Sequence, residues 1–152
     1  VKGLESQLQG RLAPAWSGYA HYTWQDARLL DFQTFTAAGA PSTNFAGYRV
    51  RMSARHIAGL GVTWSQGPWS LGASASHVGA RFLRDNVVNP QRLPPYTVAN
   101  LVATWRATPA LTVHGGVHNL GDITYINDDL SAQEAGNAGA PRSGFLRVRL
   151  QF

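Results

Sequence analysis

Apolar and polar residues alternate one by one along most of this chain, a period that suits β-strands and not amphipathic helices. The alternation recurs in six segments, at 16–24, 58–64, 69–76, 99–106, 111–118 and 146–152, and more weakly at 4–12. Because successive side chains of a strand point to opposite faces, each segment has one apolar and one polar face. The sequence therefore predicts an all-β fold of about seven strands.

The connections between these segments alternate strictly between short and long. The short ones are Ala13-Pro14-Ala15, Gln66-Gly67-Pro68 and Thr108-Pro109-Ala110, and the long ones cover about 30–55, 83–95 and 121–142. All eight prolines lie in connections, where a missing N–H interrupts no ladder of hydrogen bonds. Tight turns at one end and long loops at the other are typical of outer-membrane barrels, whereas a soluble sandwich has no reason to sort its loops by length.

The tryptophans follow the same asymmetry. Four of them lie within about three residues of a short turn and on the apolar face of their strands: Trp16, Trp64, Trp69 and Trp105. Packing in a core would explain any one of them, but four at matching depth favour a belt of aromatic rings at a membrane interface, on the periplasmic side. Tyr22 and Trp24 are expected near the opposite interface.

The polar face carries charges that hydrocarbon does not tolerate. It includes histidines and arginines at His21, Arg106, His114, His118, Arg147 and Arg149. A charged side chain facing lipid costs roughly 2–4 kcal/mol near the midplane, so this face is expected to line a wet or protein-filled lumen. Seven strands leave unpaired edges, which lipid does not tolerate, so we expect a segment of a larger antiparallel transmembrane β-barrel.

Composition excludes several other classes. The net charge of +5 and pI of about 10.2 raise the question of nucleic acid, but the charges are scattered and no binding motif accompanies them. The chain has no cysteine and hence no disulfide or thiolate metal site. His114 and His118 share a face but stand ~13 Å apart along their strand, too far to bridge one metal. We expect no metal and no cofactor.

Catalytic motifs are also missing from the sequence. Ser70, Ser74 and Ser76 alternate on the lumenal face, without a nucleophile elbow or a zinc-binding His-Glu helix. Asp128 and Asp129 fall in a long loop, where solvation is the simpler interpretation. We therefore expect that the chain is not an enzyme.

Short motifs resemble one family in order and spacing. Residues 1–31, Gly67-Pro68-Trp69-Ser70-Leu71-Gly72, Tyr96-Thr97-Val98, Val117-His118-Asn119-Leu120-Gly121-Asp122 and Gly139-Ala140-Pro141-Arg142, followed by the alternating end at Phe152, are similar to the late barrel of TonB-dependent outer-membrane receptors. The fourth motif resembles the near-terminal "V-x-N-L-F-D" signature. Gly121 replaces the usual aromatic residue, and His77 and Asn100 stand where Tyr and Asp are expected.

The resemblance implies a fold, a location and a function. Members of the family have twenty-two strands, an N-terminal plug domain and a TonB box, so we expect residues 1–152 to be the last seven strands, without plug or box. The expected location is the outer membrane of a Gram-negative bacterium. The expected function is active uptake of a scarce nutrient, a ferric siderophore, energised through TonB; this segment would form barrel wall and external loops.

Candidate binding residues follow from this expectation. Guanidinium groups suit anionic chelates, which predicts ligand contacts at Arg49, Arg51, Arg55, Arg81, Arg84 and Arg92, with Tyr48 or Phe45 as a stacking surface. The alternatives are contacts with lipopolysaccharide phosphates and ordinary solvation. Asn119 and Asp122 are interpreted as residues of a structural turn.

The closing strand resembles the C-terminal signal that the barrel-assembly machinery reads. This assignment covers Leu146, Val148, Leu150 and Phe152, and the simpler alternative is a strand that only faces lipid.

Two rival functions remain open at this point. One is a small free-standing outer-membrane barrel with a structural or adhesive role, which needs an eighth strand near residues 43–52. The other is a barrel-type outer-membrane enzyme, such as a protease or an acyltransferase.

Overall fold

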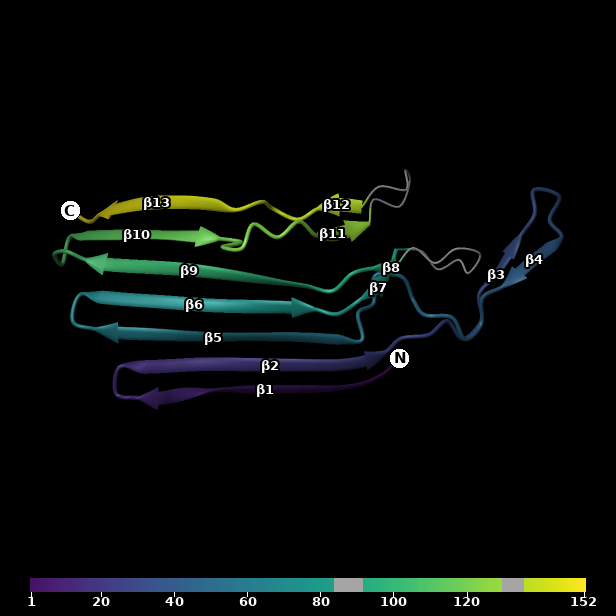
Figure 1. Ribbon diagram of the computed structural model, residues 1–152, viewed down its shortest axis with the longest axis horizontal. Coiled ribbons are helices and arrows are strands. Elements are labelled where there is room, and N and C mark those ends of the chain that lie inside the picture. The colour runs from purple at the N-terminus through teal and green to yellow at the C-terminus, as the bar shows by residue number, and fades with distance from the viewer. Residues whose placement is uncertain (84–91, 130–135) are drawn as a thin grey trace.

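Seven long strands form a single antiparallel sheet in the computed structural model, which describes residues 1–83, 92–129 and 136–152 (Figure 1). Each strand pairs with the next one along the chain that belongs to the sheet. The order is β1 (Lys2–Ala13), β2 (Trp16–Asp26), β5 (His56–Gln66), β6 (Trp69–Val78), β9 (Tyr96–Arg106), β10 (Leu111–His118) and β13 (Ser143–Leu150). The prediction of seven antiparallel strands is confirmed. None of the described residues forms a helix long and apolar enough to cross a membrane.

The three tight turns all lie at one end of the sheet, and the three long connections all lie at the other (Figure 1). Gly67 adopts a φ of 56°, which lets the chain reverse direction within the β5–β6 turn. In the β9–β10 turn, the Thr108 hydroxyl accepts hydrogen bonds from the backbone N–H groups of Ala110 and Leu111. The turn residues recognised in the sequence therefore do set the hairpins.

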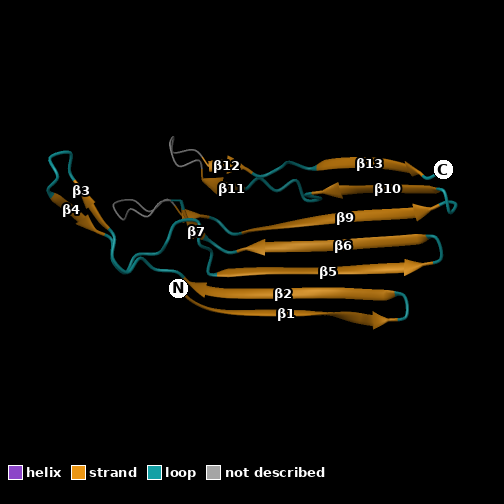
Figure 2. Ribbon diagram, turned by 180° about the vertical axis from the view of Figure 1, so that it is seen from behind, coloured by secondary structure: helices purple, strands orange, loops and turns teal. Residues whose placement is uncertain are grey.

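Each long connection carries a small two-stranded ribbon of its own (Figure 2). The pairs are β3 (Gln33–Phe35) with β4 (Pro41–Asn44), β7 (Arg81–Phe82) with β8 (Arg92–Leu93), and β11 (Ile126–Asp129) with β12 (Gly136–Ala138). The eighth strand that a small free-standing barrel would need is not found at 43–52. Residues 41–44 pair with β3 beyond the sheet, and Arg49 forms only an isolated bridge with Arg28.

Strand register places the apolar side chains of neighbouring strands side by side. Trp16 faces Trp64, which faces Leu71 on the next strand. Large side chains of this face are exposed, for example Leu8 at 76%, Leu60 at 58% and Leu146 at 76%. The buried apolar residues of the described chain lie outside the seven-stranded sheet, at Ala27, Phe45, Ala54, Leu83 and Leu93. Nothing in the described chain covers the apolar face, so it requires an apolar surrounding.

Aromatic rings lie flat on parts of the polar face. Tyr19 and His21 are stacked with their planes 2° apart. They lie over Gly61 and Gly59 of the neighbouring strand, where an added Cβ would come within 2.4 Å and 2.2 Å of the rings. The glycines leave the space that these rings fill.

A similar arrangement lies near the C-terminal edge of the sheet. Phe145 covers Gly116, with His114 and His118 on either side of it at ring-centroid distances of 5.2 and 5.3 Å. Both histidines thus pack against the same phenyl ring. The described residues contain no group of three side chains that could hold a metal ion.

A buried asparagine fixes the start of the third long connection. Asn119 is 2% exposed and has a φ of 51°, a left-handed conformation that asparagine tolerates better than most residues. Its side-chain amide donates to the carbonyl oxygens of Ile123 and Ala140, and its Oδ1 accepts from the Ile123 N–H. Asp122 then accepts from the N–H of Arg142. The geometry agrees with the structural role expected from the sequence.

The exposed apolar face generates a first prediction. Within the complete barrel, Leu101→Arg should lower the free energy of unfolding by roughly 2–4 kcal/mol, because a guanidinium would face hydrocarbon. The neighbouring substitution Val102→Arg changes the opposite face and should cost far less. Denaturant titration of both variants in phospholipid vesicles measures the difference, and equal losses would contradict the assignment of the faces.

The hydrogen bonds of Asn119 generate a second prediction. Asn119→Ala should destabilise the third long connection by roughly 2–4 kcal/mol, because it removes three side-chain hydrogen bonds and leaves buried backbone groups without partners. Asn119→Gly relieves the left-handed backbone and still loses the bonds, so it should remain destabilised. The rate of hydrogen exchange at the Ile123 N–H measures the loss of stability in both Asn119 variants. Leu120→Ala, which changes an exposed neighbouring residue, is the control. Unchanged exchange in Asn119→Ala would show that these bonds contribute nothing.

Candidate functional site

The arginines predicted to bind ligand do not form one site. Arg49 and Arg55 lie in a cluster around Asp26, whereas Arg81 is buried against Tyr96, at the start of β9. The Arg84 prediction lies outside the described residues. The structure therefore separates two candidate sites at the loop end of the sheet.

The first site is the cluster of Asp26, Arg28, Arg49 and Arg55, here called the Asp26 cluster. Arg28 Nε lies 2.9 Å from one Asp26 carboxylate oxygen, and Arg55 Nη2 lies 3.7 Å from the other. Arg28 and Arg49 face each other across an isolated antiparallel bridge. Desolvation lowers the pKa of the Arg49 guanidinium from its ordinary value, and the positive charge of Arg55 lowers it further. Cations thus crowd around the carboxylate.

The remaining predicted residues lie around this cluster. Arg92 is exposed and close enough to Arg49 to act on it electrostatically. Arg51 is exposed and takes part in an interaction of its own. Tyr48 is 41% exposed, but Phe45 is only 8% exposed and packs against Tyr48 and Phe32. The expected stacking surface at Phe45 is wrong, because that ring belongs to the interior of the first long connection.

The second site joins Arg81 of the second long connection to Tyr96, the first residue of β9, and to the third long connection. This side chain is 5% exposed, and its Cζ lies 5.2 Å from the centroid of the Tyr96 ring, a cation–π distance. Tyr96 stacks on Tyr125 at 4.3 Å. The Arg81 Nη2 donates to the Ile126 carbonyl, while its Nε has no hydrogen-bond partner. A buried cation with an unused donor is held here by aromatic rings.

Beside this stack lies a hollow of about 360 Å³ on the polar face, near the loop end of the sheet. Alternation along β6, β9 and β10 places the strand residues of its lining on the polar face. A few apolar side chains contribute to the lining of the hollow. Its hydroxyl, amide and imidazole groups come from Ser76, Tyr96, Asn100, His118, Tyr125 and Asn127. We name Arg81, Tyr96, Tyr125 and this hollow the lumenal mouth site.

Sequence reasoning missed several members of the two sites. Asp26 and Arg28 come after Trp24, the last apolar residue of the alternating pattern in β2. The pattern therefore no longer indicates to which face of the strand they belong. Tyr96 and Asn100 could have been found, because the period of two places them with the polar residues of β9. Tyr125 could not, because only the folded third connection brings it against Tyr96.

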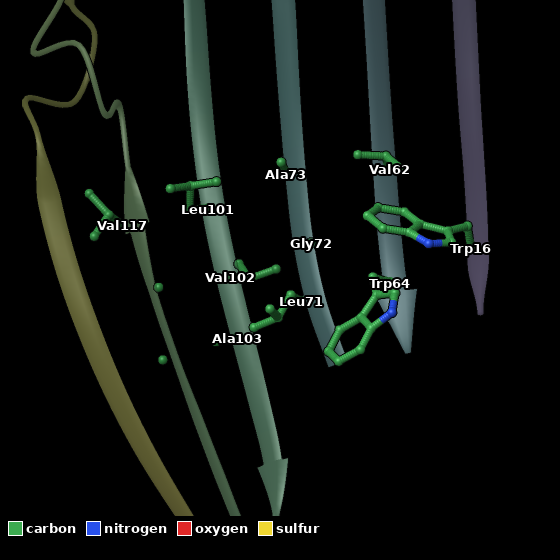
Figure 3. A pocket seen from close by; sticks show the side chains of 12 residues that line it. Trp16, Val62, Trp64, Leu71, Gly72, Ala73, Leu101, Val102, Ala103 and Val117 are labelled. Carbon is green, nitrogen blue, oxygen red and sulfur yellow. The ribbon is translucent and has the colours of Figure 1, made fainter. Parts of the chain in front are cut away.

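A larger hollow of about 790 Å³ lies near the tight turns, among the side chains of the apolar face (Figure 3). Trp16 and Trp64 project beside each other from adjacent strands. Leu71 of β6, Leu101 of β9 and Val117 of β10 complete the apolar lining. Trp69 and Trp105 stack at 5.5 Å on the same face. Register places the four tryptophans on one face in two pairs, Trp16 beside Trp64 and Trp69 beside Trp105, which are two residues apart along the strands. The lining is almost entirely apolar, which suits hydrocarbon and not a polar ligand.

Comparisons with known proteins identify the architecture. The family model described as TonB dependent receptor-like, beta-barrel, matches residues 1–120. A comparison with curated proteins found no relative. Solved structures superpose over almost the whole chain. The ferric-catecholate import receptor Fiu of E. coli K12 does so at a TM-score of 0.75 and 23% identity, over 99% of this chain and 20% of its own.

Two further structures agree with this architecture. The siderophore receptor PiuA of Acinetobacter baumannii matches at a TM-score of 0.83 and 22% identity, over 97% of this chain and 21% of its own. The ferric yersiniabactin uptake receptor FyuA of Yersinia pestis matches at a TM-score of 0.76 and 18% identity, over 99% of this chain and 23% of its own. The chain thus spans about a fifth of the length of these proteins, and at such identities the likeness concerns the fold.

Receptors of this family are transporters of the Gram-negative outer membrane and not enzymes, as expected from the sequence. The seven-stranded wall, its uncovered apolar face and the match over residues 1–120 agree with one another. The chain belongs to the TonB-dependent receptor β-barrel family and forms part of the barrel wall.

Proposed function

We propose that this chain is the last seven strands of an active-transport receptor that takes up a ferric siderophore, energised by TonB through an N-terminal plug domain and TonB box. The observation that carries the proposal is the lumenal mouth site, where a buried arginine and two stacked tyrosines adjoin a polar hollow. The matched structures include receptors whose descriptions refer to ferric-catecholate import and ferric yersiniabactin uptake, which supports this class of ligand.

The chemistry of the lumenal mouth site suits an anionic chelate with flat rings. A guanidinium attracts the oxygen anions that surround a chelated ferric ion, and its planar donors can bond two of them. The Tyr96 and Tyr125 side chains both line the hollow, where they can contact an aromatic ring of the ligand. Asn100 and Asn127 add amide donors and acceptors on the walls. Arg81 is therefore the arginine that we retain as a ligand contact from the sequence-based set.

Two further roles are proposed for the strand residues. The level of Trp16, Trp64, Trp69 and Trp105 forms the periplasmic aromatic belt, where amphipathic rings meet lipid headgroups. The alternating side chains of the closing strand, Leu146, Val148, Leu150 and Phe152, serve as the signal for the barrel-assembly machinery. Their exposures of 76, 57, 59 and 116% support this role, because the whole row is accessible to another protein.

Removing the cation at the lumenal mouth site should impair ligand capture. In the complete receptor, Arg81→Gln should weaken binding of the ferric chelate about tenfold or more, because a charge-assisted contact is lost. Tyr96→Leu keeps an apolar side chain but removes the ring, and should also weaken binding. Uptake and equilibrium binding of a panel of radiolabelled iron chelates, with cells grown under iron limitation, measure the effect and select the ligand.

A matched control separates binding from folding in this experiment. Arg106→Gln removes the same charge at the opposite end of the lumenal face, in the last residue of β9, and should leave chelate binding unchanged. Heat-modifiable migration confirms that each variant is a folded barrel. If no ferric chelate in the panel binds, or if Arg81→Gln binds it as tightly as the unmodified receptor, the lumenal mouth site is not where a siderophore is captured.

The assembly signal can be tested separately. Phe152→Ala should lower the amount of folded receptor in the outer membrane several-fold, because the assembly machinery loses an aromatic anchor. Gln151→Ala, which alters the neighbouring residue on the other face, should have little effect. Quantitative immunoblots of isolated outer membranes give the comparison. Equal levels of both variants would leave the closing strand with only its role in the wall.

A further inference from the structure

Cations gather on one part of the lumenal face, at the end of the sheet that carries the tight turns. Register aligns Arg106 with Thr112 and Thr112 with Arg149, across β9, β10 and β13. Arg147 lies two residues farther along β13, beside His114 of β10. Neighbouring strands are about 4.8 Å apart, so roughly 10 Å separates the backbones of Arg106 and Arg149. We call Arg106, Arg147 and Arg149 the lumenal arginines.

The lumenal arginines have no anionic partner within the described part of the chain. Each is exposed, and none forms an ion pair or a side-chain hydrogen bond with another described residue. None of the eight acidic residues of the sequence lies in β5, β6, β9, β10 or β13. Arg11 differs, because it lies at the same end of β1 but donates to the Pro14 carbonyl. Neighbouring cations without a counter-charge create a positive potential that attracts anions.

A hollow of about 650 Å³ lies among these side chains. Its lining includes the guanidinium groups of Arg106 and Arg149 and the hydroxyl groups of Thr104, Thr108 and Thr112. Guanidinium and hydroxyl groups can both donate hydrogen bonds to oxygen anions. Because the tight turns of outer-membrane barrels face the periplasm, this hollow lies at the periplasmic end of the lumenal wall.

A column of rings connects the lumenal arginines with the lumenal mouth site. His118 lines the hollow of that site. Phe145 lies between His118 and His114, with ring-centroid distances of 5.3 and 5.2 Å. His114 in turn pairs with Arg147 across the strands, and its Nδ1 lies 2.7 Å from the Thr104 hydroxyl. The column follows β9, β10 and β13, which lie side by side at the C-terminal edge of the sheet (Figure 1).

Elsewhere near the tight turns, the lumenal face carries mostly hydroxyl and amide groups. A hollow of about 390 Å³ on β1, β2 and β5 is lined by Gln9, Ser17 and Thr63, among others. On β5 and β6, the hydroxyls of Ser65 and Ser70 lie 3.0 Å apart. Such groups can hydrogen-bond a ligand but provide no charge-assisted contact to an anion. The strongest attraction for an anion is therefore on β9, β10 and β13.

We propose that the lumenal arginines form an exit site, which receives the anionic ferric chelate after it leaves the lumenal mouth site along β9, β10 and β13. Flat rings of the chelate pass against His118, Phe145 and His114, and its oxygen anions then bond to the arginines. The inference rests on the proposed function, because the attraction requires an anionic cargo. An acidic segment of the plug domain is the alternative partner of the arginines. The chelate is favoured because the column of rings leads from the capture site, whereas a fixed ion pair has no need of it.

The test compares binding with transport in the complete receptor. The probe is a radiolabelled ferric tris-catecholate, an anionic chelate with flat rings, given to cells grown under iron limitation. An uncoupler stops energised transport while equilibrium binding is measured, and the uptake rate is measured without it. Arg147→Gln/Arg149→Gln should slow uptake about tenfold, because charge-assisted contacts on the way out are lost. Its dissociation constant should stay within about twofold of the unmodified value, because capture occurs at the other end of the wall.

Two variants control for charge and for folding. Arg147→Lys/Arg149→Lys should keep the uptake rate within about threefold of the unmodified receptor, since lysine still provides a cation. Arg11→Gln removes a lumenal cation at the same end of the wall, on β1, and should leave both binding and uptake unchanged. Heat-modifiable migration confirms that each variant is a folded barrel.

The possible results separate the exit site from the proposed function. Normal binding together with normal uptake in the glutamine variant would overturn the exit site and leave the proposed function standing. If the unmodified receptor does not bind the probe, the assignment of an anionic ligand with flat rings fails, and the exit site fails with it. Slowed uptake accompanied by entry of vancomycin, a large antibiotic, would show that the arginines hold the plug in place, which also overturns the proposal.

Discussion

The whole structure depends on a sheet whose two faces require different surroundings. Strand pairing satisfies the backbone hydrogen bonds, but nothing in the described chain covers the apolar face. A soluble protein would bury such a surface under a second layer. Here the surface is left to hydrocarbon, which explains why charged groups are confined to the polar face and to the strand ends. The position of both candidate sites follows from this partition, because each lies where the wall leaves the lipid.

The loops, not the sheet, contain the buried apolar residues of the described chain. Phe45, Leu83 and Leu93 each lie in a long connection and help to hold it in place. Folded loops can orient side chains as precisely as a domain interior does. This accounts for the separation of Arg81, held against Tyr96, from the arginines around Asp26. Residues that look equivalent in the sequence thus meet different environments: Arg81 is buried against an aromatic ring, whereas Arg28 and Arg55 are exposed beside Asp26.

The sequence was sufficient to predict the wall and only part of the sites. Period two reveals which face each residue of a strand occupies, so the level shared by Trp16 and Trp64 could be read directly. Strand ends were less certain. β2 continues past Trp24 to Asp26, and β9 begins at Tyr96, before the alternation that is visible in the sequence from Ala99. The contact between Tyr96 and Tyr125 depends on how a long connection folds back, and no local pattern encodes that. Phe45 was misjudged for the same reason.

The order of the sheet has a consequence for how such a wall is built. Every strand of the seven pairs with the strand that precedes or follows it in the sheet and in the sequence, so the meander contains no crossover. Low sequence separation between partners keeps the entropy of chain closure small at each step. The wall can therefore grow one hairpin at a time, and the newest strand always presents an open row of N–H and C=O groups. A growing edge of this kind serves as a template for the next segment at every stage of insertion.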